Sequence, residues 1–143
     1  MADPTTNQLR VRLVTPERIL IECLATSVDL PSKSGYFEAL YGHAPTVAEL
    51  GAGDVILHGS ECEGQTFNVS WGFVEVLPDR VTILASDALK PEEIDVPRAE
   101  QQLERGQQEW KEAGDSEEAY TEALRVISEA EAKINSAKGA VKH

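Results

Sequence analysis

The chain has 143 residues, of which 41% are hydrophobic, so it is long enough for one packed domain or for a small domain with an appendage. Its 25 acidic and 13 basic residues give a net charge of −12, which argues against nucleic acid and anionic membrane surfaces as partners because both repel it. The charge suits a basic protein partner, and it equally suits solubility alone.

The sequence contains no segment that is typical of membrane insertion or secretion. No apolar run approaches the roughly 18–20 residues that a membrane-spanning helix needs. Residues 1–8 are polar and lack the apolar core of a secretory signal. We therefore expect the protein to stay in the cytosol or an equivalent compartment.

The two cysteines, Cys23 and Cys62, do not form a Cys-x-x-Cys motif. Thiols stay reduced in a cytosolic compartment, so we expect both to be reduced and packed. A structural disulfide between them is the alternative.

Apolar residues recur at every second position through the first ninety residues, which predicts strands. Leu9, Val11 and Leu13 alternate with polar residues, as in a half-buried strand. In the next strand, Ile19, which comes after a turn at residues 15–18, is expected on the apolar side. The other predicted extended segments are 25–31, 35–40, 45–50, 54–58, 67–71, 73–77 and 81–85. Gly72 interrupts the pattern and predicts a bulge. Eight to ten short strands with turns between them favour an antiparallel sandwich or barrel.

Nothing in this first part predicts an active site. The three histidines, His43, His58 and His143, are scattered and have no metal-ligand spacing. The sequence has no glycine-rich phosphate loop after a strand and no Gly-x-Ser-x-Gly motif. We expect no catalytic residues and no metal site, and we interpret this part as a scaffold or docking module.

Between Pro91 and Pro97 the spacing of the apolar residues changes. Before this segment they recur at every second position, and after it at every third or fourth, which predicts a change from sheet to helix. Pro91 cannot donate to a strand ladder, so the sheet should end before it. Pro97 is tolerated in a first helical turn, and Asp95 lies where a helix N-cap is expected.

Two apolar stripes then predict a pair of helices joined near Gly114, which fits a helix C-terminus, and Asp115–Glu118, which offers an N-cap. The stripes are Ala99, Leu103, Gly106, Trp110 and Ala113, then Tyr120, Ala123, Ile127, Ala130, Ile134, Ala137 and Val141. Matching stripes with a short connection predict an antiparallel hairpin. Because most of these residues are small, the seam buries little surface, and we infer that the hairpin is marginally stable and able to open. A static hairpin is the alternative.

Charge is uneven along the second predicted helix. Residues 115–131 carry six acids and one base, Arg125, whereas Lys133, Lys138 and Lys142 follow without an acid between them. These lysines complement the helix dipole, or they form a cationic end for an acidic partner.

Three local patterns in this order resemble the epsilon subunit of F-type ATP synthase across residues 8–140. They are Ser34-Gly35 followed by Tyr41-Gly42-His43-Ala44-Pro45, then Trp71-Gly72-Phe73-Val74-Glu75-Val76 with Arg80-Val81-Thr82-Ile83-Leu84-Ala85, then Ile94-Asp95-Val96-Pro97-Arg98-Ala99. The resemblance implies an α+β protein, with a ten-stranded sandwich over residues 1–90 and a helical hairpin over 91–143.

The resemblance also implies a non-catalytic rotor subunit of the central stalk, on the cytoplasmic face of a bacterial inner membrane or an equivalent membrane. The sandwich would bind the gamma subunit and the polar loops of the c-ring. The ring-facing loop maps to residues 34–40. The implied interface residues are Ser34, Gly35, Tyr36, Phe37, Glu38, Gly42 and His43.

In this family the helical tail acts as a brake on ATP hydrolysis, and its partner in the brake is an acidic segment of the beta subunit. Some bacterial members bind regulatory ATP through a motif that Ile94, Asp95, Arg98 and Ala99 match, which implies ATP contacts at these four residues. No cofactor is required for the coupling role. Two alternatives stay open: Asp95 serves only as a helix cap, or the chain is a stand-alone ATP-sensing module.

Overall fold

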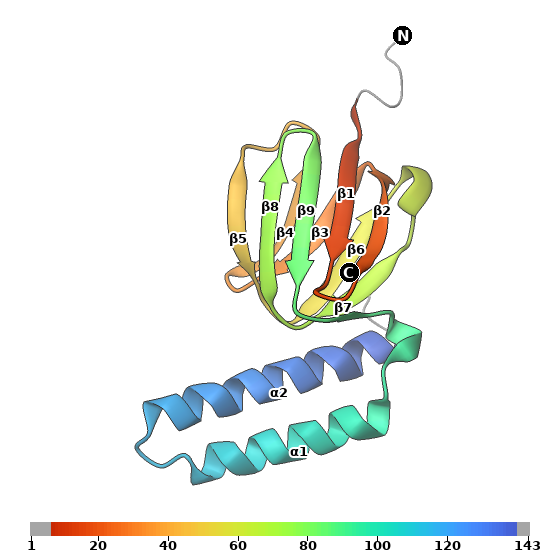
Figure 1. Ribbon diagram of the computed structural model, residues 1–143. Helices are drawn as coiled ribbons and strands as arrows, with labels where there is room; N and C mark the ends of the chain where they lie inside the picture. Colours follow the sequence, from red (N-terminus) through yellow and green to blue (C-terminus); the bar gives the residue numbers. More distant parts are fainter. Residues whose placement is uncertain (1–6, 140–143) are drawn as a thin grey trace. The chain divides into compact units, whose positions relative to one another are not determined.

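The computed structural model describes residues 7–139 and divides the chain into two compact units, Met1–Leu89 and Lys90–His143. The first unit is built from strands and the second from helices (Figure 1).

The first unit contains ten strands, as the alternating pattern and the family resemblance predict. Their bounds are β1 (Leu9–Val14), β2 (Ile19–Ala25), β3 (Ser27–Ser32), β4 (Gly35–Leu40), β5 (Thr46–Leu50), β6 (Gly53–His58), β7 (Thr66–Val69), β8 (Gly72–Leu77), β9 (Arg80–Ala85) and β10 (Ala88–Leu89). A short 3-10 helix, η2 (Ser60–Cys62), connects β6 with β7. The predicted sandwich is thereby confirmed.

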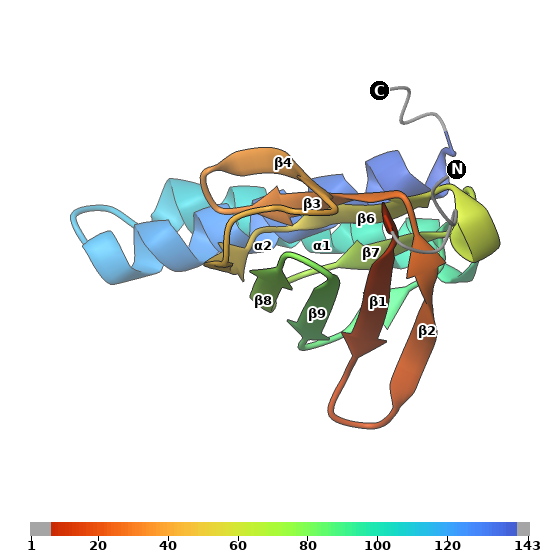
Figure 2. The same cartoon turned by 90° about the horizontal axis from the view of Figure 1, so that it is seen from above.

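The strands form two layers, which Figure 2 shows from above. One layer has the order β10-β7-β6-β3-β4, and the other has the order β5-β8-β9-β1-β2. The layers join where Ser32 of β3 pairs with Leu50 of β5. β1 lies between β9 and β2, parallel to β9 and antiparallel to β2. All other neighbouring strands in the unit pair antiparallel.

The core lies between the two layers and is formed by alternate residues along the strands. Leu9, Val11 and Leu13 of β1 are fully buried, whereas Arg10 and Arg12 face outward. The other fully buried large side chains are Val28, Leu30, Leu50, Val55, Leu57, Val69, Val74, Val76 and Ile83. Burying each of these side chains stabilises the fold by about 1.5–3 kcal/mol before the entropy cost of ordering.

Two local predictions are wrong. Gly72 is the first residue of β8 and pairs with Ala85, rather than forming a bulge. It has a φ of +151°, and a Cβ atom there would collide with the carbonyl oxygen of Leu84, so the close approach of the backbones requires glycine. The register irregularity lies instead between Leu13 and Val14 of β1. It turns Ile19 outward to 48% exposure, although the alternation placed this residue on the apolar side.

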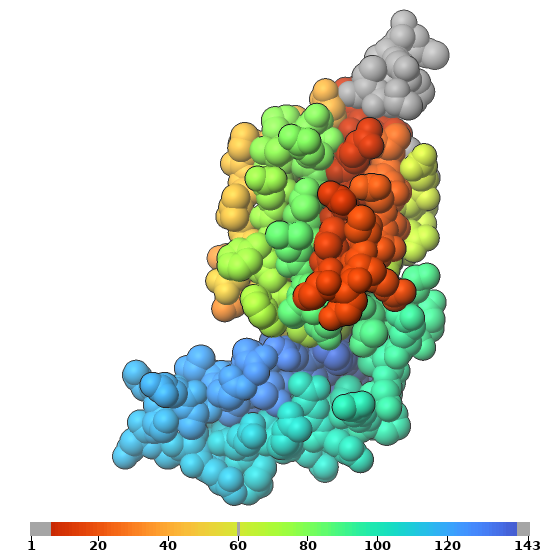
Figure 3. Space-filling view, in the orientation of Figure 1, coloured from red at the N-terminus to blue at the C-terminus, as the bar shows by residue number. Residues whose placement is uncertain are grey.

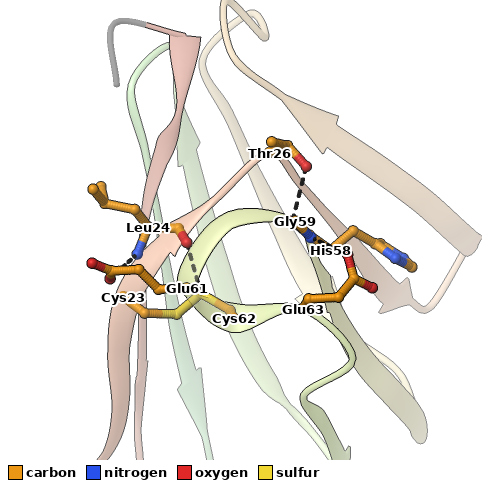
Figure 4. Close-up of a disulfide and its surroundings, with 8 residues drawn as sticks. All are labelled: Cys23, Leu24, Thr26, His58, Gly59, Glu61, Cys62 and Glu63. Atoms are coloured by element: carbon orange, nitrogen blue, oxygen red, sulfur yellow. Dashed lines mark hydrogen bonds between the residues drawn. A yellow bond between two sulfur atoms is a disulfide. The ribbon is translucent and has the colours of Figure 1, made fainter. Parts of the chain in front are cut away.

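Cys23 and Cys62 form a disulfide, so the expectation of reduced thiols is wrong for this structure (Figure 4). Their Cα atoms lie 6.3 Å apart although 39 positions separate them in the sequence. The connection between β6 and β7 brings Cys62 to the outer edge of β2. Sequence spacing contains no signal for such a long-range contact.

The second unit consists of η3 (Pro91–Glu93), α1 (Val96–Glu112) and α2 (Glu117–Ala137). The Oδ1 atom of Asp95 accepts a hydrogen bond from the backbone N–H of Arg98, which confirms the predicted N-cap. Pro97 lies in the first turn of α1. After α1, Gly114 takes a φ of +58°, and Ser116 then caps α2 by accepting from the backbone N–H of Ala119.

The two helices are paired along the predicted stripes, with small residues at the contact. Ala99 and Gly106 of α1 are buried, as are Ala123 and Ala130 of α2. The rings of Trp110 and Tyr120 pack across the seam with centroids 5.8 Å apart. Val141, Lys142 and His143, which also figured in the sequence predictions, lie outside the described residues. No helix within residues 7–139 is both long and apolar enough to cross a lipid bilayer.

Candidate functional site

The predicted ring-facing loop is a strand with a turn at each end. β4 pairs with β3 along its whole length, from Ser32–Gly35 to Ser27–Leu40. At the first end, the Oγ atom of Ser32 accepts from the backbone N–H of Ser34 at 3.2 Å and donates to the carbonyl oxygen of Gly35 at 2.6 Å. Gly35 has a φ of +119°, which favours glycine in this turn.

Along β4, alternate side chains face outward and inward. Tyr36, Glu38 and Leu40 are exposed, whereas Phe37 packs against the core of the unit. The backbone N–H of Asp54 donates to the hydroxyl of Tyr36 at 2.7 Å, which fixes the ring on the surface of β3 and β6. Burial raises the pKa of Tyr36, and the nearby carboxylates of Asp54 and Asp29 add to the increase. β4 therefore presents two large half-exposed side chains and one acid.

The other predicted interface residues lie at the far end of β4. The backbone N–H of Gly42 donates to the carbonyl oxygen of Pro78 at 2.7 Å, so the turn after β4 is tied to the turn between β8 and β9. The Nδ1 atom of His43 lies 2.7 Å from the carbonyl oxygen of Ala44, and its ring centroid is 6.1 Å from that of Phe37. The structure thus brings Phe37 and His43 together and places Ser34 and Gly35 at the opposite end of the strand.

A second surface, which the sequence analysis missed, crosses the outer face of the other layer. Four apolar residues pair with one another across neighbouring strands. Phe73 of β8 pairs with Leu84 of β9, and Leu84 pairs with Val14 of β1. Val14 in turn pairs with Ile19 of β2. Phe73, Leu84 and Ile19 are each about half exposed, at 49%, 52% and 48%. We refer to Val14, Ile19, Phe73 and Leu84 as the outer apolar row. Figure 3 shows the strands that carry it, with β8 and β9 in green and β1 in red.

Charged residues border the outer apolar row. Glu49 of β5 continues the row beyond Phe73. In the adjacent row, Arg12 and Glu22 form an ion pair at 3.2 Å. Trp71, which precedes β8 and is 49% exposed, extends the apolar surface along the chain. The sequence contained one signal for the outer apolar row. In β8 and β9 the inward-facing positions are apolar, as expected for a core, but Phe73 and Leu84 are apolar residues at outward-facing positions.

The four residues predicted to contact ATP surround the start of α1. Ile94 and Ala99 are buried, and Arg98 is exposed. The carboxylate of Asp95 accepts the cap hydrogen bond described above. The structure therefore supports the capping role of Asp95. Arg98 is the one cation of the four residues, and the exposed Arg105 lines the same shallow pocket.

The one arginine of the second helix is already paired. The guanidinium of Arg125 donates to the carboxylates of Glu122 and Glu129, one turn away on either side. The hydrogen bond that Arg125 donates to Glu122 is the largest cause of a raised pKa of Arg125, and the same bond lowers the pKa of Glu122. A phosphate chain would have to compete with two carboxylates for this cation. Among residues 7–139, no group of three or more His, Cys, Asp or Glu is arranged to hold a metal ion.

Comparisons with known proteins identify relatives of this architecture. Residues 8–91 match the family model described as ATP synthase, Delta/Epsilon chain, beta-sandwich domain. The ATP synthase epsilon chain of Koribacter versatilis is 42% identical over 104 residues, which cover 71% of this chain and 71% of the relative. The epsilon chain of Moorella thermoacetica is 40% identical over 104 residues, which cover 73% of this chain and 78% of the relative.

Solved structures share the fold. A chain in the cryo-EM structure of the Euglena gracilis mitochondrial ATP synthase, with OSCP, F1 and the c-ring, superimposes with a TM-score of 0.76 at 19% identity, covering 92% of this chain and 81% of that chain. A chain in the central stalk and c-ring structure of the Tetrahymena thermophila enzyme gives a TM-score of 0.60 at 14% identity, covering 94% and 96%. At these identities the likeness shows the fold alone.

Proposed function

Because the chain belongs to the ATP synthase epsilon chain family, we propose that it is a non-catalytic subunit of the central stalk that docks on the gamma subunit and on the polar loops of the c-ring. In this role it is a peripheral component on the cytoplasmic face of a bacterial inner membrane or an equivalent membrane. ATP hydrolysis belongs to the assembled enzyme.

The outer apolar row is the observation that carries the proposal for gamma. Neighbouring strands lie about 4.8 Å apart, and one turn of an α-helix rises about 5.4 Å. A helix lying along the row would therefore place one apolar side chain beside each strand, from Phe73 on β8 to Ile19 on β2. Half-exposed aromatic and aliphatic anchors bordered by charges are typical of protein interfaces. A coiled coil such as gamma offers a helix of this kind.

The surface of β4 supports the proposal for the c-ring. Tyr36, Leu40 and Tyr41 are each about half exposed, and Glu38 lies between them in the outward direction. Such a surface suits loops of mixed polar and apolar character. We propose that the exposed face of β4, with Ser34 and His43 at its two ends, contacts the polar loops.

The helical hairpin supports a regulatory role. Most of the buried residues of the two helices are small, so closing the hairpin buries few large side chains. These buried residues are Ala99, Gly106, Ala123, Val126, Ala130 and Ser136. We propose that the hairpin opens and lies alongside gamma, where it slows rotation in the direction of hydrolysis. The exposed Lys138 near the end of α2 would then be available to an acidic segment of the beta subunit.

Regulatory ATP binding is the alternative proposal. It would use Arg98 at the start of α1, with Ile94, Asp95 and Ala99 around it. The cap hydrogen bond of Asp95 and the two carboxylates at Arg125 favour the coupling and braking role over an ATP sensor.

Hydrolysis by the assembled enzyme tests the regulatory proposal. The measurement compares the enzyme with the intact chain and with a chain truncated after Leu89, the last residue of the strand unit. We expect faster hydrolysis on truncation, with unchanged assembly. Unchanged hydrolysis would restrict the proposal to coupling, and failure of the intact chain to co-purify with gamma would overturn it altogether.

A further inference from the structure

The disulfide joins the two layers of the strand unit at an edge. Cys23 lies on β2, the last strand of its layer, and Cys62 lies in η2, between β6 and β7 of the other layer. Cys62 is buried, with 1% of its surface exposed, whereas Cys23 is partly exposed. Figure 4 shows the two sulfur atoms bridging from β2 to η2.

Several hydrogen bonds hold η2 and its flanking residues against β2 independently of the disulfide. The carboxylate of Glu61 accepts from the backbone N–H of Leu24 at 3.1 Å (Figure 4). The backbone N–H and the Oγ1 hydroxyl of Thr26 both donate to the carbonyl oxygen of His58, at 2.8 and 2.9 Å. These contacts would keep the two cysteines adjacent after the bond between them is broken.

The surroundings of Cys62 also suit a free thiol. Its Sγ atom lies 3.0 Å from the carbonyl oxygen of Leu24. Sulfur in a disulfide has no hydrogen to donate, but a thiol at this position would donate to that oxygen. A thiol at Cys62 would therefore find a hydrogen-bond acceptor without a change in the backbone.

We propose that Cys23 and Cys62 form a reversible modification site for low-molecular-weight disulfides. The thiolate of Cys23 attacks one sulfur of the external disulfide, forms a mixed disulfide and releases one thiol. The thiolate of Cys62 then attacks the Sγ atom of Cys23 and releases the second thiol. The two protein thiols lose two protons and two electrons, and the external disulfide is reduced to two thiols.

The exposure of the two residues sets the order of these steps. An external disulfide reaches the partly exposed Cys23, whereas Cys62 is enclosed by the core. Cys62 is therefore the residue that resolves the mixed disulfide. A reductant acts in reverse and attacks Cys23 first.

The consequence of oxidation is a change in stability without a change in shape. A bridge across 39 residues restricts the unfolded chain, whereas the native backbone already holds the sulfur atoms in place. We expect oxidation to lower the unfolding equilibrium constant by roughly 30- to 1,000-fold. This inference is independent of the docking role proposed above, because it concerns only contacts within the strand unit.

The first experiment uses the full-length chain, reduced with dithiothreitol and then incubated with oxidised glutathione. Thiols counted in denaturant should fall from two to none, and peptide mapping should link Cys23 to Cys62. Urea unfolding should show the expected change in the equilibrium constant. The amide of Leu24 should stay protected from hydrogen exchange in the reduced form, although less strongly than in the more stable oxidised form. Thiols that stay free, a linked form of unchanged stability, or loss of Leu24 protection on reduction would each overturn the proposal.

Single substitutions test the order of attack. Cys62→Ser should accumulate one glutathione on Cys23, because the resolving thiol is missing. Cys23→Ser should react at least about tenfold more slowly, because only the buried Cys62 remains. Equal rates would overturn the assigned order. The double variant Cys23→Ser/Cys62→Ser is the matched control, and its unfolding curve should be the same with and without oxidised glutathione.

Discussion

A Cβ atom added to Gly106 would lie 2.8 Å from the Cγ1 atom of Ile127 and 3.1 Å from that of Val126, so α1 meets α2 here through a residue without a side chain. This contact sets how closely the hairpin closes. It also makes Gly106 a sensitive position for testing whether the hairpin opens.

We expect Gly106→Ala to weaken the pairing of the two helices. The methyl group costs about 1–3 kcal/mol through overpacking, which equals or exceeds the gain of about 1 kcal/mol in helix propensity. Spin labels on α1 and α2 should report a broader distribution of distances, and hydrogen exchange across the seam should be faster. Gln107→Ala, on the exposed neighbouring position, is the control. Unchanged distances and exchange would show that the seam tolerates the methyl group.

The outer apolar row and the surface of β4 should bind different partners. We expect Phe73→Glu/Leu84→Glu to weaken binding to gamma by at least about tenfold, because losing an interface anchor typically costs about 2 kcal/mol or more. Leu40→Glu should instead weaken binding to the c-ring. Each variant is the control for the other, since all three residues are about half exposed and their substitution should change stability by less than about 1 kcal/mol.

Calorimetric titrations of purified gamma and of purified c-ring with each variant provide the measurement. If Leu40→Glu weakens gamma binding as much as the double variant does, the two surfaces are not distinct. If neither variant affects gamma, the outer apolar row is not its docking surface.

Calorimetry with ATP should separate the rotor role from the alternative of an ATP sensor. We expect no saturable binding in the micromolar range, because Asp95 is engaged as a cap and Arg125 is paired with two glutamates. Glu122→Gln/Glu129→Gln removes the competing charges and should favour weak binding if the site exists at all. Micromolar binding by the natural sequence that is lost in Arg98→Ala would instead support the sensor.

Tyr36 should ionise late as the pH rises. Burial raises its pKa above the ordinary value of 10.0, so its neutral form is favoured in the folded state. The neutral form of Tyr36 therefore contributes to the free energy of unfolding. This contribution is fully present below pH 10.0 and is lost as the pH rises through the raised pKa. In a Tyr41→Phe/Tyr120→Phe background, Tyr36 is the remaining tyrosine, and its ultraviolet absorbance should change with a midpoint above 10.0.

The control adds Tyr36→Phe to that background. It should remove the absorbance change and flatten the alkaline loss of stability. A midpoint at or below 10.0 would mean that the hydrogen bond from the backbone N–H of Asp54, which lowers the pKa, outweighs the effects of burial and of the nearby carboxylates.

Local periodicity made most of the fold predictable. Alternation at Leu9, Val11 and Leu13 identified an inward strand face, and the change of period around Pro97 identified the start of α1. The cap at Asp95 was predictable because a carboxylate just before a first-turn proline is a strong helix-start signal. These features depend on neighbours within a few residues.

Features that depend on register and long-range contacts were not predictable in this way. Ile19 faces solvent because of an irregularity opposite it on β1, and the outer apolar row exists only once the pairing of four strands is known. The disulfide depends on where the connection between β6 and β7 lies. For the docking surface, the sequence supplied candidate residues on β4, and the outward apolar residues Phe73 and Leu84 were its one signal for the row on the other layer.

The parallel pairing of β1 with β9 has a consequence for how the chain is made. β1 lies between β2 and β9, and β9 is synthesised some seventy residues after β1. Until that later strand emerges, one edge of the initial hairpin has no partner, and unpaired strand edges are prone to join other chains. A nascent chain stalled before Arg80 should therefore depend on chaperones, and one released after Ala85 should not.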